Sequence, residues 1–267
     1  MPEKINGKKK LLFDCFIVSL FALLIYSRFV GLNWGLPYPM HPDERNMANA
    51  VQQLNCKVSN FRECFNPRFF AYGQFPLYIS YLLVWAVRGF RNFGKIIINF
   101  EEAVMSLRVI SAMASVINAI IIIKIINIII KKNFYLLSFI SYLLVIFSPF
   151  FIQFSHFGTT ESLLMLFYSL IVYLSMRLLE RHTTYEVVWL ALVSGLAVAT
   201  KVSSIIFIIV PLITILSSLR SWDRYKNLIK FGTLTIIFMV LLSPHNLINF
   251  RDFFSSIRFE SDVALGK

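Results

Sequence analysis

Residues 134–154 read FYLLSFISYLLVIFSPFFIQF, a run of 21 residues without a charged side chain. A helix needs about 20 mainly apolar residues to cross the hydrocarbon core of a bilayer. Six further apolar runs occur along the chain, so the sequence predicts an all-α polytopic membrane protein with about seven transmembrane helices. These runs are about Leu11–Gly31, Ser106–Ile130, Thr160–Met176, Val187–Thr200, Val202–Leu219 and Phe231–Leu247.

The composition supports this class. The chain of 267 residues is 57% hydrophobic and 15% charged, with a mean hydropathy of +0.69. Soluble domains are closer to one quarter charged. The net charge of +12 comes from Lys and Arg scattered between the apolar runs, as expected of membrane helix flanks, so it does not indicate nucleic-acid binding.

The first apolar run follows a basic segment that contains Lys4, Lys8, Lys9 and Lys10. The run is longer than the core of a cleaved signal peptide and is followed by Trp34, a residue typical of the membrane interface. We therefore expect an uncleaved first span with a cytoplasmic N-terminus. Asp14 and Arg28 lie near its two ends, where charged side chains can snorkel toward water.

The segment Gln74–Phe90 decides the topology. If it lies along the outer interface rather than crossing, most of the short basic loops fall on the cytoplasmic side, as the positive-inside rule prefers. Tyr78, Tyr81 and Trp85 suit the headgroup zone. We therefore predict an outer juxtamembrane helix here, although Arg88, Arg91 and Lys95 then lie outside. The residues placed inside are Lys131, Lys132, Arg177, Arg181, Arg220, Arg224 and Lys226.

On this topology the candidate functional groups converge on the outer face of what we predict to be a cell membrane. They are Asp43, Glu44, Arg45, Arg68, His156, Glu161, Lys201 and His245. Ionisable groups at the membrane are costly to place and are functional candidates by default. Lys201 joins two apolar runs that form a tight helical hairpin, which favours an anion site over simple snorkelling. Asp43 and Glu44 are alternatively first-turn residues of a helix over 45–54.

Metal binding has little support in the sequence. The acidic and His residues could hold a divalent cation only if they converged, and no ligand spacing requires it. No cofactor motif is present, such as a Gly-rich phosphate loop. Cys15 falls in the first span, whereas Cys56 and Cys64 lie in the first outer loop, where they are either a local disulfide or two free thiols.

Several motifs resemble those of the GT-C superfamily of membrane glycosyltransferases, in the branch of the protein O-mannosyltransferases and aminoarabinose transferases. The acidic motif His41–Arg45 after a first span carries the resemblance first. The other matches occur in the family's order along the chain. They are Asn66–Gly73, Phe75–Tyr78, Arg108–Ala112, His156–Ser162 with Glu161 in place of Asp, Gly195–Lys201 and Ser243–Asn246.

The resemblance implies one GT-C-like transmembrane domain over residues 1–267, with residues 33–100 as the first outer loop. It implies transfer of a sugar from a polyprenyl-phosphate donor to a lipid, glycan or protein acceptor on the outer face, with inversion. Asp43 would be the general base, and Glu44 a second catalytic acid that orients it. Arg68 and Lys201 would bind the donor phosphate. Glu161, His156 and Tyr72 would contact the substrate.

One departure from the family and one rival reading remain. The relatives continue with more spans and often an outer soluble domain, so the resemblance predicts that this chain is an N-terminal portion. A transporter or lipid flippase is the alternative function, with Lys201 and the acids lining a pathway. Transporters usually contain internal repeats and broken helices near the midplane. No clear repeat is present, and the charged groups gather at one face, which favours the glycosyltransferase.

Overall fold

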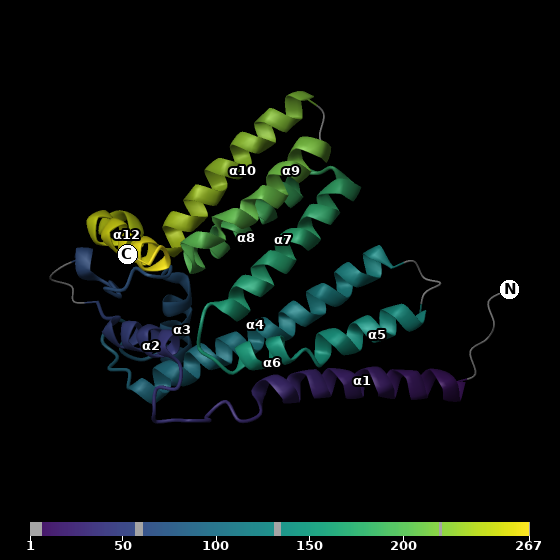
Figure 1. Ribbon diagram of the computed structural model, residues 1–267, viewed down its shortest axis with the longest axis horizontal. Helices are drawn as coiled ribbons and strands as arrows, with labels where there is room; N and C mark the ends of the chain where they lie inside the picture. Colours follow the sequence, from purple (N-terminus) through teal and green to yellow (C-terminus); the bar gives the residue numbers. More distant parts are fainter. Residues whose placement is uncertain (1–6, 57–60, 131–134, 219–220, 267) are drawn as a thin grey trace.

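The computed structural model describes residues 7–56, 61–130, 135–218 and 221–266, and all regular elements in these ranges are helices (Figure 1). The predicted all-α polytopic class is therefore confirmed. The elements in chain order are α1 (Gly7–Phe29), α2 (Pro42–Gln53), η1 (Phe61–Glu63), α3 (Phe75–Val87), α4 (Phe100–Ile129), α5 (Tyr135–Ile146), α6 (Pro149–Ser155), α7 (Glu161–Arg181), α8 (Thr184–Thr200), η2 (Val202–Ile208), α9 (Ile209–Ser218), α10 (Ser221–Leu242), α11 (His245–Ile248) and α12 (Phe250–Ala264).

Four helical stretches among the described residues are long and apolar enough to cross a membrane. They are Phe100–Ile129, Leu136–Ser155, Glu161–Arg181 and Asp223–Leu242. Three shorter apolar stretches coincide with the remaining predicted spans: Cys15–Phe29, Thr184–Thr200 and Val202–Ser218. At 1.5 Å per residue, the 17 residues of α8 reach only about 25 Å, slightly less than a typical hydrocarbon core.

Proline accounts for the interruptions in two of these segments. Pro149 begins α6 after a break that ends α5 at Ile146, because proline has no N–H to continue the helix. Pro211 lies near the start of α9, and its ring would clash with the carbonyl of Phe207 in a regular α-helix. The residues that directly follow Lys201 accordingly form the 3₁₀ helix η2, and α9 begins after it.

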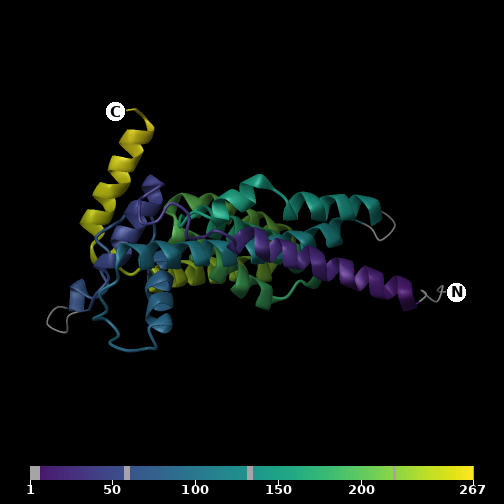
Figure 2. The same ribbon diagram turned by 90° about the horizontal axis from the view of Figure 1, so that it is seen from below.

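The helices outside the predicted spans gather at one end of the bundle, which we call the loop end (Figures 1 and 2). Figure 2 shows α3 and α12 running across the direction of the long helices rather than along it. The helix α3 has 13 residues, too few to cross a bilayer. This is the length and direction expected of a juxtamembrane helix at Gln74–Phe90.

Three apolar cores among the described residues hold this arrangement together, and the smallest packs Leu20 and Leu24 of α1 against α4 and α5. The membrane core includes Leu166, Ile171, Leu190 and Ala197 and lies between α4, α7, α8, α9 and α10. The close approach of α8 to α10 depends on Gly195, where a Cβ would come within 2.6 Å of the Cβ of Phe238. A second core packs α2 and α3 against the first part of α4.

Arg28 does not snorkel as expected. Its side chain is fully buried, and its guanidinium donates to the carbonyl oxygens of Ile146 (2.5 Å) and Val145 (3.4 Å) and to Ser115 (3.4 Å). These carbonyls are the unpaired ones at the end of α5, where the chain breaks before Pro149. A cation there is favoured by the negative end of the helix dipole.

Candidate active site

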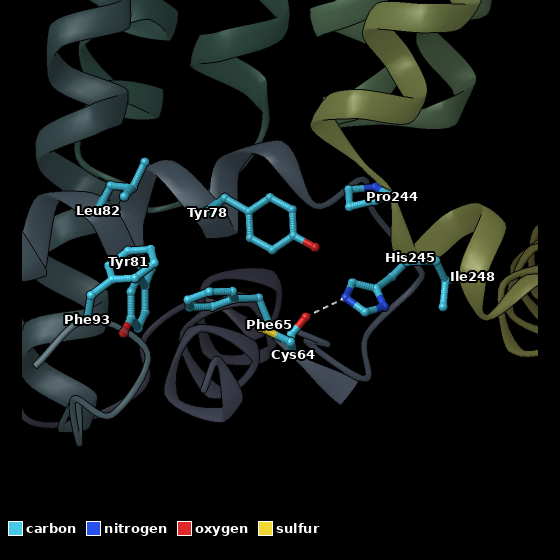
Figure 3. Close-up of a pocket in the computed structure, with 9 residues that line it drawn as sticks. All are labelled: Cys64, Phe65, Tyr78, Tyr81, Leu82, Phe93, Pro244, His245 and Ile248. Carbon is cyan, nitrogen blue, oxygen red and sulfur yellow. Dashed lines mark hydrogen bonds between the residues drawn. The ribbon is translucent and has the colours of Figure 1, made fainter. Parts of the chain in front are cut away.

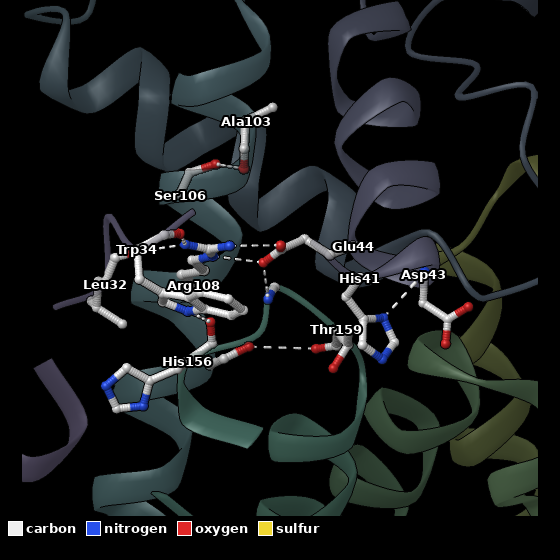
Figure 4. A network of polar contacts seen from close by, with 12 residues as sticks. Leu32, Trp34, His41, Asp43, Glu44, Ala103, Ser106, Arg108, His156 and Thr159 are labelled. Atoms are coloured by element: carbon white, nitrogen blue, oxygen red, sulfur yellow. Dashed lines mark hydrogen bonds and ion pairs between the residues drawn. The ribbon is translucent and has the colours of Figure 1, made fainter. Parts of the chain in front are cut away.

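The start of helix α2 positions the acidic motif. His41 is its N-cap and accepts a hydrogen bond at Nδ1 from the backbone N–H of Asp43 (3.2 Å), and Pro42 occupies the first helical turn. Consecutive residues on a helix point about 100° apart. The carboxylates of Asp43 and Glu44 therefore diverge, as Figure 4 shows.

Glu44 is buried in an ion pair with Arg108 of α4. Arg108 donates from Nε to Oε1 (2.7 Å) and from Nη2 to Oε2 (2.8 Å), a bidentate geometry. Its Nη1 donates to the carbonyl oxygens of Leu32 and Trp34, both at 2.7 Å (Figure 4). The guanidinium also lies 5.1 Å from the centre of the Trp34 ring. Each of the three guanidinium nitrogens thus has a partner in the loop after α1 or on α2.

The same glutamate fixes the turn before α7. The backbone N–H of Gly158 donates to Oε1 of Glu44 at 2.6 Å. A side chain at position 158 would bring its Cβ within 2.6 Å of the Cβ of Leu107, so only glycine fits. Glu44 therefore joins α2, α4 and the turn that leads to Glu161. Its oxygens are occupied by these structural contacts.

Asp43 faces a different group of side chains. Tyr72, in the first loop, lies within the electrostatic influence of Asp43. Burial, and secondly the negative charge of Asp43, raise the pKa of the Tyr72 phenol above its ordinary value. Glu161 and Glu260 add smaller contributions of the same sign, which places both acids in the electrostatic surroundings of Tyr72.

Lys201 completes this group. Its Nζ lies 4.9 Å from the centre of the Tyr72 ring and 3.7 Å from Oε1 of Glu161. The side chains of Lys201 and Glu161 are 31% and 27% exposed, so both are partly desolvated yet accessible. Oε2 of Glu161 is buried and accepts no hydrogen bond. This oxygen is therefore an unsatisfied acceptor that protein atoms enclose.

Backbone contacts hold Tyr72 against the hairpin that carries Lys201. The N–H of Gly73 donates to the carbonyl of Thr200 at 3.0 Å. Next to it, the fully buried Gln74 donates its N–H to Ser243 (2.9 Å) and accepts at Oε1 from the N–H of His245 (2.9 Å). The first loop, the α8–η2 hairpin and the end of α10 meet at these two residues.

His245 extends this network to the disulfide. Its Nε2 lies 2.9 Å from the carbonyl oxygen of Cys64, and Cys64 is bonded to Cys56 (Figure 3). The aromatic rings of Phe65, Tyr78 and Tyr81 line an almost wholly apolar pocket of about 520 Å³ beside His245 (Figure 3). The disulfide thus belongs to the wall that supports Gln74 and, through it, Tyr72.

Replacing Gly73 with alanine should disturb the candidate site more than its small size suggests. The new Cβ would lie 1.9 Å from the carbonyl oxygen of Ala199, so the loop must move and carry Tyr72 away from Lys201. We expect a loss of about 1–3 kcal/mol in stability, as for other overpacked sites.

Thermal unfolding of the purified chain in detergent measures the effect of Gly73→Ala. The matched control is Gly232→Ala on α10, where nothing lies within 4 Å of the new Cβ. That change should be neutral or stabilising, because alanine favours a helix interior over glycine. Equal melting temperatures for the two variants would contradict the close contact between loop and hairpin.

Two predicted site residues lie elsewhere. Arg68 pairs with Glu63 at 3.3 Å, and its side chain is 70% exposed. His156 lies with Nδ1 2.8 Å from the carbonyl of Ile152 and Nε2 2.9 Å from that of Val30, on the far side of Arg108 from Asp43 (Figure 4). The structure therefore brings together Asp43, Tyr72, Glu161 and Lys201, and leaves Arg68 and His156 out.

The sequence reasoning missed the roles of Arg108 and Gln74. Arg108 stood out as a charge inside an apolar run, which is a signal of a buried partner, but the sequence does not name Glu44 as that partner. Gln74 had no comparable signal. Among the described residues, no cluster of three or more His, Cys, Asp or Glu side chains has an arrangement that could hold a metal ion.

Comparison with known families adds a finding that is independent of this geometry. Residues 91–248, more than half of the chain, match the family described as dolichyl-phosphate-mannose-protein mannosyltransferase. The chain belongs to this family. It is therefore a membrane glycosyltransferase of the GT-C type, as the motifs predicted. The matched range includes Arg108, Glu161 and Lys201 but begins after Asp43. No curated protein and no solved structure matches the chain.

Proposed function

We propose that the chain transfers a sugar from a polyprenyl-phosphate donor to an acceptor hydroxyl, with Asp43 as general base and inversion at the anomeric carbon. The observation that carries the proposal is the grouping of Asp43, Tyr72, Glu161 and Lys201 at the loop end. A carboxylate and a cation are the groups that such a reaction needs. Family membership supports the lipid-linked donor.

In the proposed reaction the acceptor oxygen attacks the anomeric carbon while its proton passes to Asp43. The bond between the anomeric carbon and the phosphate oxygen breaks, and the lipid phosphate leaves with the bonding electrons. In this proposal Tyr72, which lies within the electrostatic influence of Asp43, helps to orient the base. Lys201 meets the charge that grows on the phosphate, in a partly dry site where such stabilisation is large.

Glu161 and Glu44 take different roles in this proposal. Glu161 holds Lys201 through Oε1 and thereby positions the cation for the leaving phosphate. Glu44 is a positioning residue that acts through Arg108 and Gly158 rather than a second acid at the reacting atoms. In this proposal Lys201 alone binds the donor phosphate. Arg68 does not take part, because it pairs with Glu63 away from Asp43 and Lys201.

The proposed location is the cell membrane, with the N-terminus in the cytoplasm and the loop end outside. Two features support this orientation. The Cys56–Cys64 disulfide lies in the first loop, and disulfides persist in oxidising compartments. The basic residues Arg224 and Lys226 begin α10 at its end away from the loop end, where the positive-inside rule places cytoplasmic charge.

Lys201→Ala tests the donor side of the proposal. Loss of a charged partner for phosphate costs about 1.5–3 kcal/mol, so we expect kcat/KM for the lipid-phosphate-sugar donor to fall about ten- to hundredfold. The assay measures transfer by the chain in lipid vesicles at several donor concentrations. Lys201→Arg should restore part of the rate, because the charge returns.

The matched control is Lys230→Ala, since Lys230 lines a pocket with Thr184, at the end of α8 opposite Lys201. It should leave donor kinetics unchanged. If Lys201→Ala and Lys230→Ala behaved alike, Lys201 would not be the phosphate partner. If the wild-type chain transferred no sugar from any lipid-phosphate donor, the proposed function itself would fail.

A further inference from the structure

A polar cavity is lined in part by the same first loop that carries Tyr72 of the candidate active site. Its volume is about 410 Å³, within the range of small-molecule pockets. It opens between the first loop and the segment where α11 meets α12. The residues that line it are Glu63, Asn66, Arg68, Phe70, Asn249 and Asp252. The cavity contains Arg68, the cation that stands apart from Lys201.

The charge of this cavity argues against phosphate. Its walls carry two carboxylates, Glu63 and Asp252, against the single guanidinium of Arg68. Arg68 is already paired with Glu63 at 3.3 Å. An anionic ligand would therefore meet a net negative wall. A neutral ligand that offers many hydroxyl groups meets no such penalty.

The shapes of the polar groups fit a carbohydrate. Carboxylates, amides and a guanidinium each present two neighbouring atoms, which match pairs of vicinal hydroxyls that donate and accept together. Asn66, which is 6% exposed, is fixed by donating from Nδ2 to Glu63 (3.2 Å) and accepting at Oδ1 from the N–H of Arg68 (3.0 Å). Phe70 supplies an apolar wall. Glu63, Asn66 and Arg68 are therefore held in place before a ligand arrives.

The position of the cavity relates it to the proposed reaction. Phe70 and Tyr72 are two residues apart, so at most about 7 Å of chain separates the cavity wall from the ring that contacts Lys201. Helix α12 links the two sites as well. Polar residues occur at every fourth position on one face of α12, at Asp252, Ser256 and Glu260. Asp252 lines the cavity, and Glu260 acts electrostatically on Tyr72.

We propose that this cavity binds a pyranose unit of a glycan acceptor and so presents the next hydroxyl of that acceptor to Asp43. The inference rests on the proposed function for its place in the reaction. The pyranose chemistry itself follows from the lining residues. Its occupant is a sugar of the acceptor rather than of the donor, because the cavity lacks a free cation for the donor phosphate.

Binding of methyl α-D-mannopyranoside to the purified chain in detergent tests the site directly. Saturation-transfer NMR should detect the probe on the wild-type chain. Asp252→Asn and Glu63→Gln, on two separate elements, should each weaken binding about tenfold or more, since each removes a charged hydrogen-bond acceptor. Asp262→Asn on α12, outside the cavity, should leave binding unchanged. No detectable binding to the wild-type chain, or equal binding by all four proteins, would overturn the proposal.

Transfer kinetics separate this inference from the proposed function. With a glycan acceptor, Asp252→Asn should raise the acceptor KM about tenfold and leave kcat and the donor KM unchanged. A raised donor KM instead would assign the cavity to the donor sugar and overturn the acceptor assignment. If an unglycosylated Ser-containing peptide competed with the glycan acceptor and the mannoside did not, the occupant of the cavity would be a peptide rather than a carbohydrate. If the chain bound the mannoside but transferred no sugar from lipid-phosphate donors, the pyranose site would be supported and the proposed reaction would be refuted.

Discussion

Asp43→Asn should lower sugar transfer by about 10²–10⁴-fold while the chain still folds and inserts. Asparagine keeps the shape of the side chain and its place after the N-cap His41, but it cannot take the proton of the acceptor hydroxyl. General-base catalysis contributes a factor of this size. Single-turnover transfer by the chain in vesicles, with donor saturating, measures the chemical step rather than donor binding.

The control for this prediction is Asp262→Asn, which makes the same chemical change on α12, away from Tyr72. It should transfer at the wild-type rate. If Asp43→Asn also kept near-normal transfer, the base would be another group. Glu161 is then the first candidate, because its Oε2 is unpaired, whereas both oxygens of Glu44 bind Arg108 or Gly158.

Part of the candidate site follows from sequence alone, for identifiable reasons. Lys201 at the junction of two apolar runs must lie at a membrane edge, and Asp43, in the polar segment after the first span, must lie outside the hydrocarbon core. Their meeting through Tyr72 could be expected only from the family resemblance. The backbone contact between Gly73 and Thr200 that joins the loop to the hairpin has no pattern in the sequence.

The misplacement of Arg68 has a local cause. Arg68 has a backbone φ of +51°, in the left-handed region that non-glycine residues seldom adopt, and Asn66 accepts its N–H. This turn directs the side chain to Glu63 rather than toward Lys201. Sequence spacing cannot reveal a left-handed residue that is not glycine. The division of labour between Asp43 and Glu44, in contrast, could have been inferred, since neighbours on a helix face different directions.

Hydropathy alone predicts the membrane spans, but it does not explain two arginines that are buried within them. Apolar runs specify helices by hydropathy alone, and four of the seven predicted spans have helices long and apolar enough to cross a membrane among the described residues. Arg28 and Arg108 are fully buried inside such runs, where hydropathy predicts only a cost. The cost of burying each arginine is offset by partners from distant parts of the chain. Arg28 donates to carbonyl oxygens at the end of α5, and Arg108 pairs with Glu44 and donates to two loop carbonyls.

Arg108→Met should be the most damaging single change to stability. It leaves the carboxylate of Glu44 buried and without its ion-pair partner, and breaking a buried pair from one side costs about 3–5 kcal/mol. The loop carbonyls of Leu32 and Trp34 lose their donor at the same time. We expect little folded protein in the membrane fraction, and a strongly lowered melting temperature for whatever is recovered in detergent.

The double variant Glu44→Met with Arg108→Met distinguishes a stability role from a need for the charge. Removing both charges removes the unpaired ion, and such apolar replacements of buried pairs are often neutral or stabilising. The double variant should therefore melt at a higher temperature than Arg108→Met alone. It should still transfer sugar slowly, because Asp43 loses the bidentate anchor of the next residue and the fixed turn at Gly158. Recovery of stability together with full activity would mean that the ion pair does not position the base.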